Sequence, residues 1–166
     1  LPLGTGDAVL KCQKYIKSEY FLMLFPDDLI MKKNCSLNMV KLHNKLKLSV
    51  IASKKIPNKD VSRWGILKLK KFTKNNFLIK DIVEKPSIKS APSNYAVIGR
   101  YILPTKIFKI LEKLKPGQNG EIHITDAIKT LIHQNNKFIG HVFAGKYLDC
   151  GTMQGYINSF TEISKL

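Results

Sequence analysis

The sequence predicts a single α/β domain over residues 1–166, with a mostly parallel sheet and one inserted β-hairpin. Short apolar runs of strand length alternate along the chain with segments whose apolar residues have helical spacing, which is typical of strands joined by crossover helices. The chain has the length of one domain, and its 44% hydrophobic residues suffice for a buried core. The turn residues Lys74-Asn75-Asn76, between two strand-like runs, predict the hairpin.

The expected elements follow in a regular order, beginning with a helix over residues 7–17 and a strand over 20–25. This strand is apolar throughout, which is the pattern of a central strand covered on both faces, and it ends at the turn residues 26–28. Pro104 and Thr125 are expected to open two later helices, because proline suits the first turn and threonine suits the N-cap. The remaining expected strands are 46–52, 64–69, 77–83, 96–103, 138–143 and 146–148, and the remaining expected helices are 36–43, 105–114, 126–133 and 152–165.

The chain carries a formal net charge of +16, from 28 Lys and Arg residues against 12 Asp and Glu residues. Only two of the 28 are arginine, Arg63 and Arg100, whereas direct base readout and bidentate phosphate contacts favour arginine. The lysines are scattered, and the 19 Ile and 11 Asn residues indicate the codon usage of an AT-rich genome. We therefore expect a solvated basic surface and no specific nucleic-acid site, although a basic module that binds nucleic acid or an acidic partner stays open.

Membrane, disulfide and zinc proteins are disfavoured by the pattern of apolar residues and cysteines. No apolar run approaches the roughly 18–20 residues of a membrane span, and no basic-then-apolar leader opens the chain. The three cysteines, Cys12, Cys35 and Cys150, are widely spaced, and the histidines do not complete a zinc site with them. We therefore expect free thiols, no membrane association and a cytoplasmic location.

Carboxylates directly follow two of the predicted strands. Asp27 and Asp28 come after the run 20–25, and Asp149 comes after the run 146–148. Ligands of open α/β sheets bind beyond the carboxyl ends of strands, where two carboxylates can share one Mg²⁺ with phosphate oxygens. Such sharing would bring the carboxylates of Asp27 and Asp149 to on the order of 4–7 Å apart. The other interpretation, a turn at residues 27–28 and a helix cap at Asp149, stays open at this point.

Two further signals are a Glu-Lys-Pro sequence and a glycine turn. Glu84 and Lys85 precede Pro86 at the end of a predicted strand, so that a carboxylate could accept from sugar hydroxyls and an ammonium could meet a phosphate. Neighbours on a strand point to opposite faces, so these two side chains need not pair with each other. The turn 3–6 contains two glycines, whose backbone can approach a planar base or a phosphate. Each of these signals is common when taken alone.

Taken together and in this order, six motifs resemble those of the bacterial UTP–glucose-1-phosphate uridylyltransferases, also called UDP-glucose pyrophosphorylases. The motifs are PLGTGDAVL (2–10), FPDDLI (25–30), VEKP (83–86), APSNYAVIGRY (91–101), GEIHITDAI (120–128) and DCGTMQGY (149–156). The second and the last motif fit the UDP-glucose branch of the sugar nucleotidyltransferases better than the dTDP-glucose branch. The resemblance implies a Rossmann-like nucleotidyltransferase fold, which is a three-layer sandwich.

The resemblance also implies roles for seven residues. Asp27 and Asp149 match the pair that holds Mg²⁺, and Asp27 and Lys85 match catalytic positions. The matched substrate-binding positions are Gly4 beside uracil, Gly65 and Val97 beside the sugar, Glu84 on the glucose hydroxyls and Lys85 on the sugar phosphate. Two positions depart from the family pattern, since Asp7 replaces a common histidine and Trp64 replaces the tyrosine that normally precedes the glycine.

The implied reaction is the transfer of a uridylyl group from UTP to glucose 1-phosphate, which gives UDP-glucose and pyrophosphate, with Mg²⁺ as the cofactor. The resemblance also implies a homo-oligomer when the protein is complete. The Gly-x-Gly-Thr-Arg nucleotide loop of the family lies upstream of the first matched motif. We therefore expect the fold to be incomplete at its N-terminus and the chain to have little activity alone. A sibling transferase that uses another base or sugar stays open as the alternative.

Overall fold

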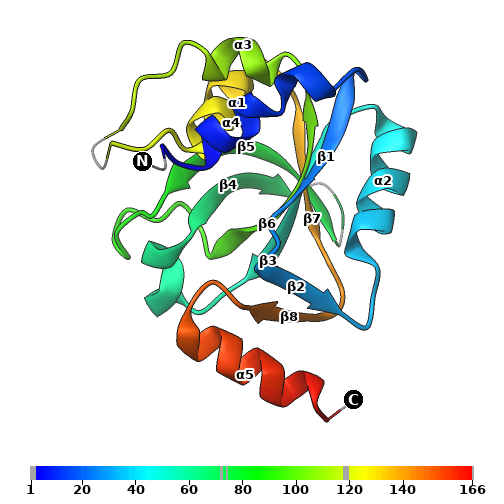
Figure 1. The fold of residues 1–166 in the computed structure, drawn as a ribbon, viewed down its shortest axis with the longest axis vertical. Coiled ribbons are helices and arrows are strands. Elements are labelled where there is room, and N and C mark those ends of the chain that lie inside the picture. Colours follow the sequence, from blue (N-terminus) through cyan, green and yellow to red (C-terminus); the bar gives the residue numbers. More distant parts are fainter. Residues whose placement is uncertain (1–2, 72, 74, 118–119, 166) are drawn as a thin grey trace.

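The structure is a computed structural model that describes residues 3–71, 73, 75–117 and 120–165. Among these residues, a six-stranded sheet in the order β1-β6-β3-β7-β5-β4 forms the centre of the fold (Figure 1). Its strands are β1 (Tyr20–Leu24), β3 (Ser49–Lys55), β4 (Gly65–Lys71), β5 (Asn76–Glu84), β6 (Tyr95–Pro104) and β7 (Phe138–Val142). The helices around it are α1 (Thr5–Lys11), α2 (Cys35–Leu46), α3 (Ile107–Leu111) and α4 (Ile124–His133), with short 3-10 helices η1 (Gln13–Tyr15) and η2 (Asn58–Arg63).

Most strands of the sheet run in one direction. β1, β3, β4 and β7 share this direction, while β5 and β6 oppose them, so β3 and β7 are the one neighbouring pair of described strands joined in parallel. The α/β class is therefore confirmed, but the expected parallel arrangement holds for strand direction and not for the pairing of neighbours. The reason is that β6 is buried along nearly its whole length, so its apolar run resembles that of a parallel strand and conceals its direction.

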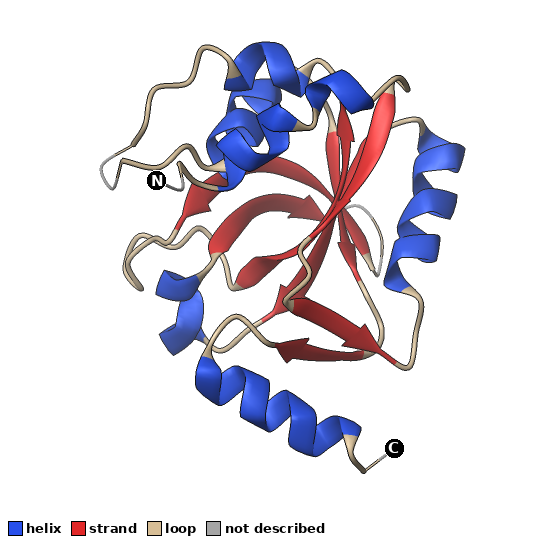
Figure 2. Cartoon of the chain, in the orientation of Figure 1, coloured by secondary structure: helices blue, strands red, loops and turns tan. Residues whose placement is uncertain are grey.

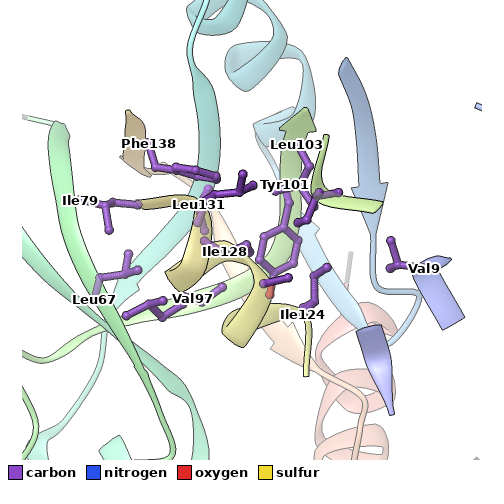
Figure 3. Close-up of a cluster of buried hydrophobic side chains, with 14 of the residues drawn as sticks. Val9, Leu67, Ile79, Val97, Tyr101, Leu103, Ile124, Ile128, Leu131 and Phe138 are labelled. Atoms are coloured by element: carbon purple, nitrogen blue, oxygen red, sulfur yellow. The ribbon is translucent and has the colours of Figure 1, made fainter. Parts of the chain in front are cut away.

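Helices cover both faces of the sheet, which gives the expected three-layer sandwich. α1, α3 and α4 lie on one face and α2 lies on the other (Figure 1, Figure 2). Alternate residues of β6 separate two cores, since Val97 and Tyr101 pack on the α4 side and Ile98 and Ile102 pack on the α2 side. Figure 3 shows the larger core, in which side chains of α4 meet those of the sheet.

A short two-stranded ribbon lies beside the main sheet. β2 (Asp28–Met31) pairs with β8 (Lys146–Asp149) in antiparallel register, with Asp28 opposite Asp149. The last helix, α5 (Met153–Ile163), follows β8 and lies next to the ribbon, at the bottom of Figure 1. The sequence does not predict β2, because its first residue, Asp28, belongs to the run 26–28 that was interpreted as a turn.

None of the five predicted helices has the expected bounds, and in three of them the difference concerns the residues that open or interrupt the helix. The helix expected over 7–17 is α1 followed by the separate 3-10 helix η1. Pro104 ends β6 and does not open α3, which begins three residues later. The helix α4 begins at Ile124 with His123 at its N-cap, so Thr125 lies inside the helix and does not cap it.

Other local expectations are confirmed. The predicted hairpin consists of β4 and β5, although Lys74 of its turn lies outside the described residues. Thr152 caps the last helix, since its side-chain oxygen accepts a hydrogen bond from the backbone N–H of Gly155 (3.0 Å). No described helix has the length and hydropathy that crossing a membrane requires.

The packing of the larger core can be tested at Leu67, which is fully buried in β4. Replacing Leu67 by alanine should lower the free energy of unfolding by about 2–5 kcal/mol, because it removes buried methyl groups and leaves a cavity. Leu37→Ala is the matched control, since Leu37 is 47% exposed on α2 and alanine is a good helix former. Urea unfolding followed by circular dichroism measures both variants. Equal losses of stability in the two variants would contradict the described packing.

Candidate functional site

A cavity of about 250 Å³ opens where several parts of the fold meet. Its lining comes from the ends of β2, β8 and β5, from the middle of β6 and from the first turn of α4. Six of the seven residues expected from the resemblance line it, namely Asp27, Gly65, Glu84, Lys85, Val97 and Asp149. The seventh, Gly4, is not among the lining residues, although its neighbour Thr5 is.

Asp28 ties the β2–β8 ribbon to the main sheet. Its Oδ2 accepts a hydrogen bond from the backbone N–H of Gly99 in β6 (2.8 Å), and its Oδ1 accepts one from the hydroxyl of Tyr147 in β8. Arg100 of β6 donates to the backbone oxygen of Asp28 (2.5 Å). Burial raises the pKa of Asp28, and the hydrogen bonds from Tyr147 and Gly99 counteract part of this rise. Asp28 therefore serves as a buried anchor for the ribbon.

Gly99 leaves the space that this anchor requires. A side chain at position 99 would collide with the carboxylate of Asp28 and with the ring of Phe25. The chain at Phe25 is itself held against β6, because its backbone N–H donates to the oxygen of Gly99 (2.7 Å). A buried carboxylate without hydrogen-bond partners costs several kcal/mol, so the close approach of β6 to Asp28 is part of what keeps the ribbon in place.

Asp27 and Asp149 converge beside the ribbon. A Cβ atom placed on Gly151 would lie 2.9 Å from Oδ2 of Asp27 and 3.3 Å from Oδ1 of Asp149, so both carboxylates face the same small volume. The backbone N–H of Cys150 donates to the backbone oxygen of Asp27 (2.8 Å), which keeps the two segments together. The two carboxylates thus meet as the sequence predicts, and the buried Asp28 is not one of the pair.

The paired carboxylates fit a divalent cation such as Mg²⁺, which prefers oxygen ligands. Asp149 also has two protein contacts, because its Oδ1 accepts from the N–H of Gly151 (3.0 Å) and its Oδ2 lies 3.1 Å from Nη2 of Arg63. The interpretation of Asp149 as a helix cap is wrong, since Thr152 caps α5. The described residues contain no group of three or more acidic, histidine or cysteine side chains that could hold a metal ion. A cation at the pair would therefore need further ligands from substrate or water.

Glu84 and Lys85 both line the cavity, although neighbours on a strand are expected to face opposite ways. The alternation ends here because β5 ends at Glu84 and Lys85 has a positive φ of 42°. This conformation costs a non-glycine residue about 1–2 kcal/mol, and backbone strain of this kind clusters at functional sites. The backbone N–H of Lys85 donates to the oxygen of Trp64 (3.0 Å), which ties this strained residue to the start of the hairpin.

Gly65 and Thr125 enclose the carboxylate of Glu84. Gly65 lies opposite Glu84 in the hairpin, and a Cβ atom on Gly65 would lie 3.1 Å from Oε2 of Glu84 and 3.3 Å from Cγ2 of Thr125. The hydroxyl of Thr125 donates to the same Oε2 (2.9 Å). Val97 of β6 lines the cavity nearby and is almost fully buried. A side chain larger than hydrogen at position 65 would therefore press on the carboxylate.

The sequence reasoning missed several polar residues of the cavity, namely Thr5, Arg63, His123 and Thr125. His123 and Thr125 belong to the motif GEIHITDAI (120–128), whose individual positions received no role. Arg63 is one of only two arginines in a lysine-rich chain, and this rarity is a signal that could have identified it. Thr5 belongs to the motif PLGTGDAVL (2–10), but it received no role there, because it accepts a hydrogen bond from the distant backbone N–H of Ile124 (3.1 Å).

Gly4 contributes to the attachment of the N-terminal segment. It has a positive φ of 97°, and a Cβ atom there would lie 2.7 Å from the backbone oxygen of Ile122. Hydrogen bonds on either side fix this approach, from the N–H of Gly6 to the oxygen of Ile122 (2.7 Å) and from the N–H of Ile122 to the oxygen of Leu3 (2.7 Å). The expected contact of Gly4 with uracil stays a prediction.

Comparison with known proteins identifies the family. The sequence pattern of the family described as Nucleotidyl transferase matches residues 1–165. The chain belongs to the nucleotidyl transferase family. Among its relatives, the UTP–glucose-1-phosphate uridylyltransferase of Pseudomonas aeruginosa is 36% identical over 159 residues, which are 94% of the chain and 57% of the relative. The enzyme of the same name from Streptococcus pyogenes is 35% identical over 95% of the chain and 54% of its own length.

Solved structures of UDP-glucose pyrophosphorylases are similar to this chain in both fold and sequence. A crystal structure of UDP-glucose pyrophosphorylase complexed with UDP-glucose has a TM-score of 0.93 and 38% identity, over 99% of this chain and 64% of the other. A UTP-bound enzyme from Acinetobacter baumannii has a TM-score of 0.84 and 31% identity, over 98% of this chain and 57% of the other. The resemblance stated from the motifs is thus confirmed. The chain spans little more than half the length of the curated relatives that it matches.

The anchor at Asp28 can be tested through Tyr147. Tyr147→Phe leaves the buried carboxylate with one donor fewer and should lower the free energy of unfolding by about 1–3 kcal/mol. Tyr156→Phe is the control, because Tyr156 is 57% exposed on α5 and its change should stay below about 0.5 kcal/mol. Urea unfolding at several pH values measures both variants.

The pH dependence adds a second criterion to the same experiment. The raised pKa of Asp28 disfavours its ionised form in the folded protein. Its contribution to stability is therefore present below the unfolded-state pKa of about 4 and is lost as the pH rises through the folded-state value. This loss should be larger in Tyr147→Phe than in the unaltered protein, because a hydrogen bond that favours the ionised form is missing. Parallel pH profiles for the two proteins would contradict the anchor.

Proposed function

We propose that this chain supplies the sugar-phosphate side of the active site of a UTP–glucose-1-phosphate uridylyltransferase. The observation that carries the proposal is a single cavity lined by Glu84 and Lys85 together with Asp27 and Asp149. The first two residues suit sugar hydroxyls and a phosphate, and the last two suit a cation bound to phosphates. The similar proteins support this proposal, because their names specify the reaction and two of the solved structures are described as bound to UDP-glucose or UTP.

The proposed reaction joins the two substrates at phosphorus. An oxygen of the phosphate of glucose 1-phosphate attacks the α-phosphorus of UTP and forms a new P–O bond. The bond between the α-phosphorus and the oxygen that bridges to the β-phosphorus breaks, and pyrophosphate leaves with that electron pair. No proton needs to be moved at the attacking oxygen, so positioning and charge neutralisation account for most of the catalysis.

Different residues of the cavity position different parts of the sugar phosphate in this proposal. Glu84 accepts hydrogen bonds from glucose hydroxyls, and the Lys85 ammonium pairs with the sugar phosphate, which holds the attacking oxygen in place. The backbones at Gly65 and Val97 border the sugar, and Gly4 lies on the side proposed for uracil. Because each interaction fixes part of the sugar phosphate, the attacking oxygen is held in one orientation before the bond forms.

Asp27 and Asp149 would hold Mg²⁺ in this proposal. The cation would supply positive charge to the phosphate oxygens of the substrates. The carboxylates of Asp27 and Asp149 share one small volume, which supports this assignment. Arg63 can compensate the charge of Asp149 when no cation is bound.

The same observations treat the two alternatives differently. A sibling transferase with another base fits the sugar side equally well, because the proposed base contact rests on Gly4 alone. A nucleic-acid module fits less well, because five acidic residues line the cavity and their carboxylates would repel a polyphosphate backbone that no cation accompanies. The cytoplasmic location and the homo-oligomer stay predictions.

The role of Glu84 can be tested with a chimaera in which this chain replaces the matched region of the Pseudomonas aeruginosa relative. Glu84→Ala should raise the KM for glucose 1-phosphate by about tenfold or more and leave the KM for UTP nearly unchanged, because a hydrogen bond to a charged group contributes about 1.5–3 kcal/mol. Glu112→Ala is the control, since Glu112 is exposed after α3 and does not line the cavity. Equal increases in both KM values would show that Glu84 does not select the sugar.

The 166 residues produced alone should bind glucose 1-phosphate weakly and form no detectable UDP-glucose. They contain no Gly-x-Gly-Thr-Arg loop for the triphosphate, and the loss of even one preorganised donor typically costs about 10²–10³ in rate. Adding the unmatched part of the Pseudomonas aeruginosa relative as a separate polypeptide should restore turnover where the two parts dock. Pyrophosphate release from UTP and glucose 1-phosphate with Mg²⁺ measures both cases. Robust turnover by the 166 residues alone would contradict the proposed division of the site.

A further inference from the structure

The carboxylate of Glu84 has one occupied oxygen and one open oxygen. Its Oε2 accepts a hydrogen bond from the hydroxyl of Thr125 (2.9 Å) and lies against the backbone of Gly65. Its Oε1 has no hydrogen-bond partner among the described residues. Every fully buried side-chain oxygen of these residues does have a partner, so Oε1 is not fully buried. Oε1 is therefore accessible, and Glu84 lines the cavity.

Thr125 is well placed to hold that carboxylate. It is the second residue of α4 and is only 7% exposed, and its methyl group would contact any side chain at position 65. Because His123 takes the N-cap position, the hydroxyl of Thr125 is not used for capping and is available to donate. A hydroxyl has a single proton, and here that proton is committed to Glu84.

The backbone beneath Thr125 is fixed by contacts with the N-terminal segment. The N–H of Ile124 donates to Oγ1 of Thr5 (3.1 Å), and Ile122 exchanges backbone hydrogen bonds with Leu3 and Gly6 (both 2.7 Å). The first turn of α4 is thereby attached to a second segment just before Thr125. A donor on a fixed backbone can hold a side chain in one orientation, which is the requirement for preorganised recognition.

We propose that Thr125 is a positioning residue, which orients Glu84 so that Oε1 is presented to the hydroxyls of the sugar. The proposal rests on the role of Glu84 in the proposed function. The terminal torsion of a glutamate is broad and has no strongly preferred angle, so a carboxylate without a fixed partner samples many orientations. With Oε2 held by Thr125, the group keeps one acceptor free, and that acceptor recognises a hydroxyl donor of a neutral sugar ring.

Thr125→Val tests this proposal in the chimaera, because valine keeps the methyl group and the shape while it removes the hydroxyl. The KM for glucose 1-phosphate should rise by about tenfold, and the KM for UTP should stay within about twofold of the unaltered value. Thr125→Ser keeps the hydroxyl and should restore the KM for glucose 1-phosphate. Thr130→Val is the matched control, since Thr130 lies on the same helix and its hydroxyl donates only to the backbone oxygen of Asp126 (2.9 Å).

A double-mutant cycle separates positioning from a general loss of structure. If Thr125 acts through Glu84, Thr125→Val should add nothing to the KM of Glu84→Ala, whereas independent effects would multiply. Thermal unfolding of each variant shows whether it is folded, and Thr125→Ala compared with Thr125→Ser answers the same question if the valine variant does not fold. Multiplying effects, an unchanged KM in Thr125→Val, or failure of serine to restore the KM would overturn the proposal. An unchanged KM in Glu84→Ala would instead overturn the assigned role of Glu84.

Discussion

The candidate site depends on one buried carboxylate. Asp28 accepts hydrogen bonds from Gly99 of β6 and Tyr147 of β8, and so it joins the small ribbon to the main sheet. A buried carboxylate is tolerated only with such partners, so the ribbon is held at the one place where β6 offers a backbone N–H and no side chain. The residues adjacent to this anchor, Asp27 and Asp149, are thereby brought to the edge of the cavity.

The opposite side of the cavity is formed by the end of β5 and the start of α4. β5 ends at Glu84, the backbone turns at Lys85 with a positive φ, and the first turn of α4 supplies Thr125. The carboxylate of Glu84 and the ammonium of Lys85 therefore line the same cavity, although the two residues are neighbours in the chain. The combination matches a ligand with both hydroxyls and a phosphate, which is the chemistry of a sugar phosphate. The two sides are set independently, and β6 is the element that connects them.

The sequence alone predicted those parts of the fold and site that depend on local pattern. The apolar run predicted β6, and the turn residues predicted the hairpin, because burial on both faces and turn chemistry are visible in consecutive residues. The run 20–25 predicted a strand, but its expected central place was wrong, since β1 lies at the edge of the described sheet with Leu22 and Leu24 exposed. Strand direction was not readable, since a strand covered on both faces looks alike in either direction. β2 was missed because its first residue, Asp28, belongs to the run 26–28 that was interpreted as a turn.

Site details depended on residues far apart in the chain. Asp27 and Asp28 are indistinguishable as neighbours, and their roles separate only because Gly99 and Tyr147 reach one of them. Thr125 fits an N-cap by local preference, yet its hydroxyl donates to Glu84, 41 residues earlier. The family motifs identified the site residues, which the periodicity of apolar residues could not do, because the motifs assign a role to each position from its place in a known order.

The most direct test of the account is a crystal structure of the chimaera with glucose 1-phosphate and Mn²⁺ in place of Mg²⁺. The account predicts anomalous density for the cation between Asp27 and Asp149, the sugar hydroxyls on Oε1 of Glu84 and the phosphate beside Lys85. A cation bound elsewhere, or a sugar phosphate outside the cavity between the ribbon and α4, would contradict it.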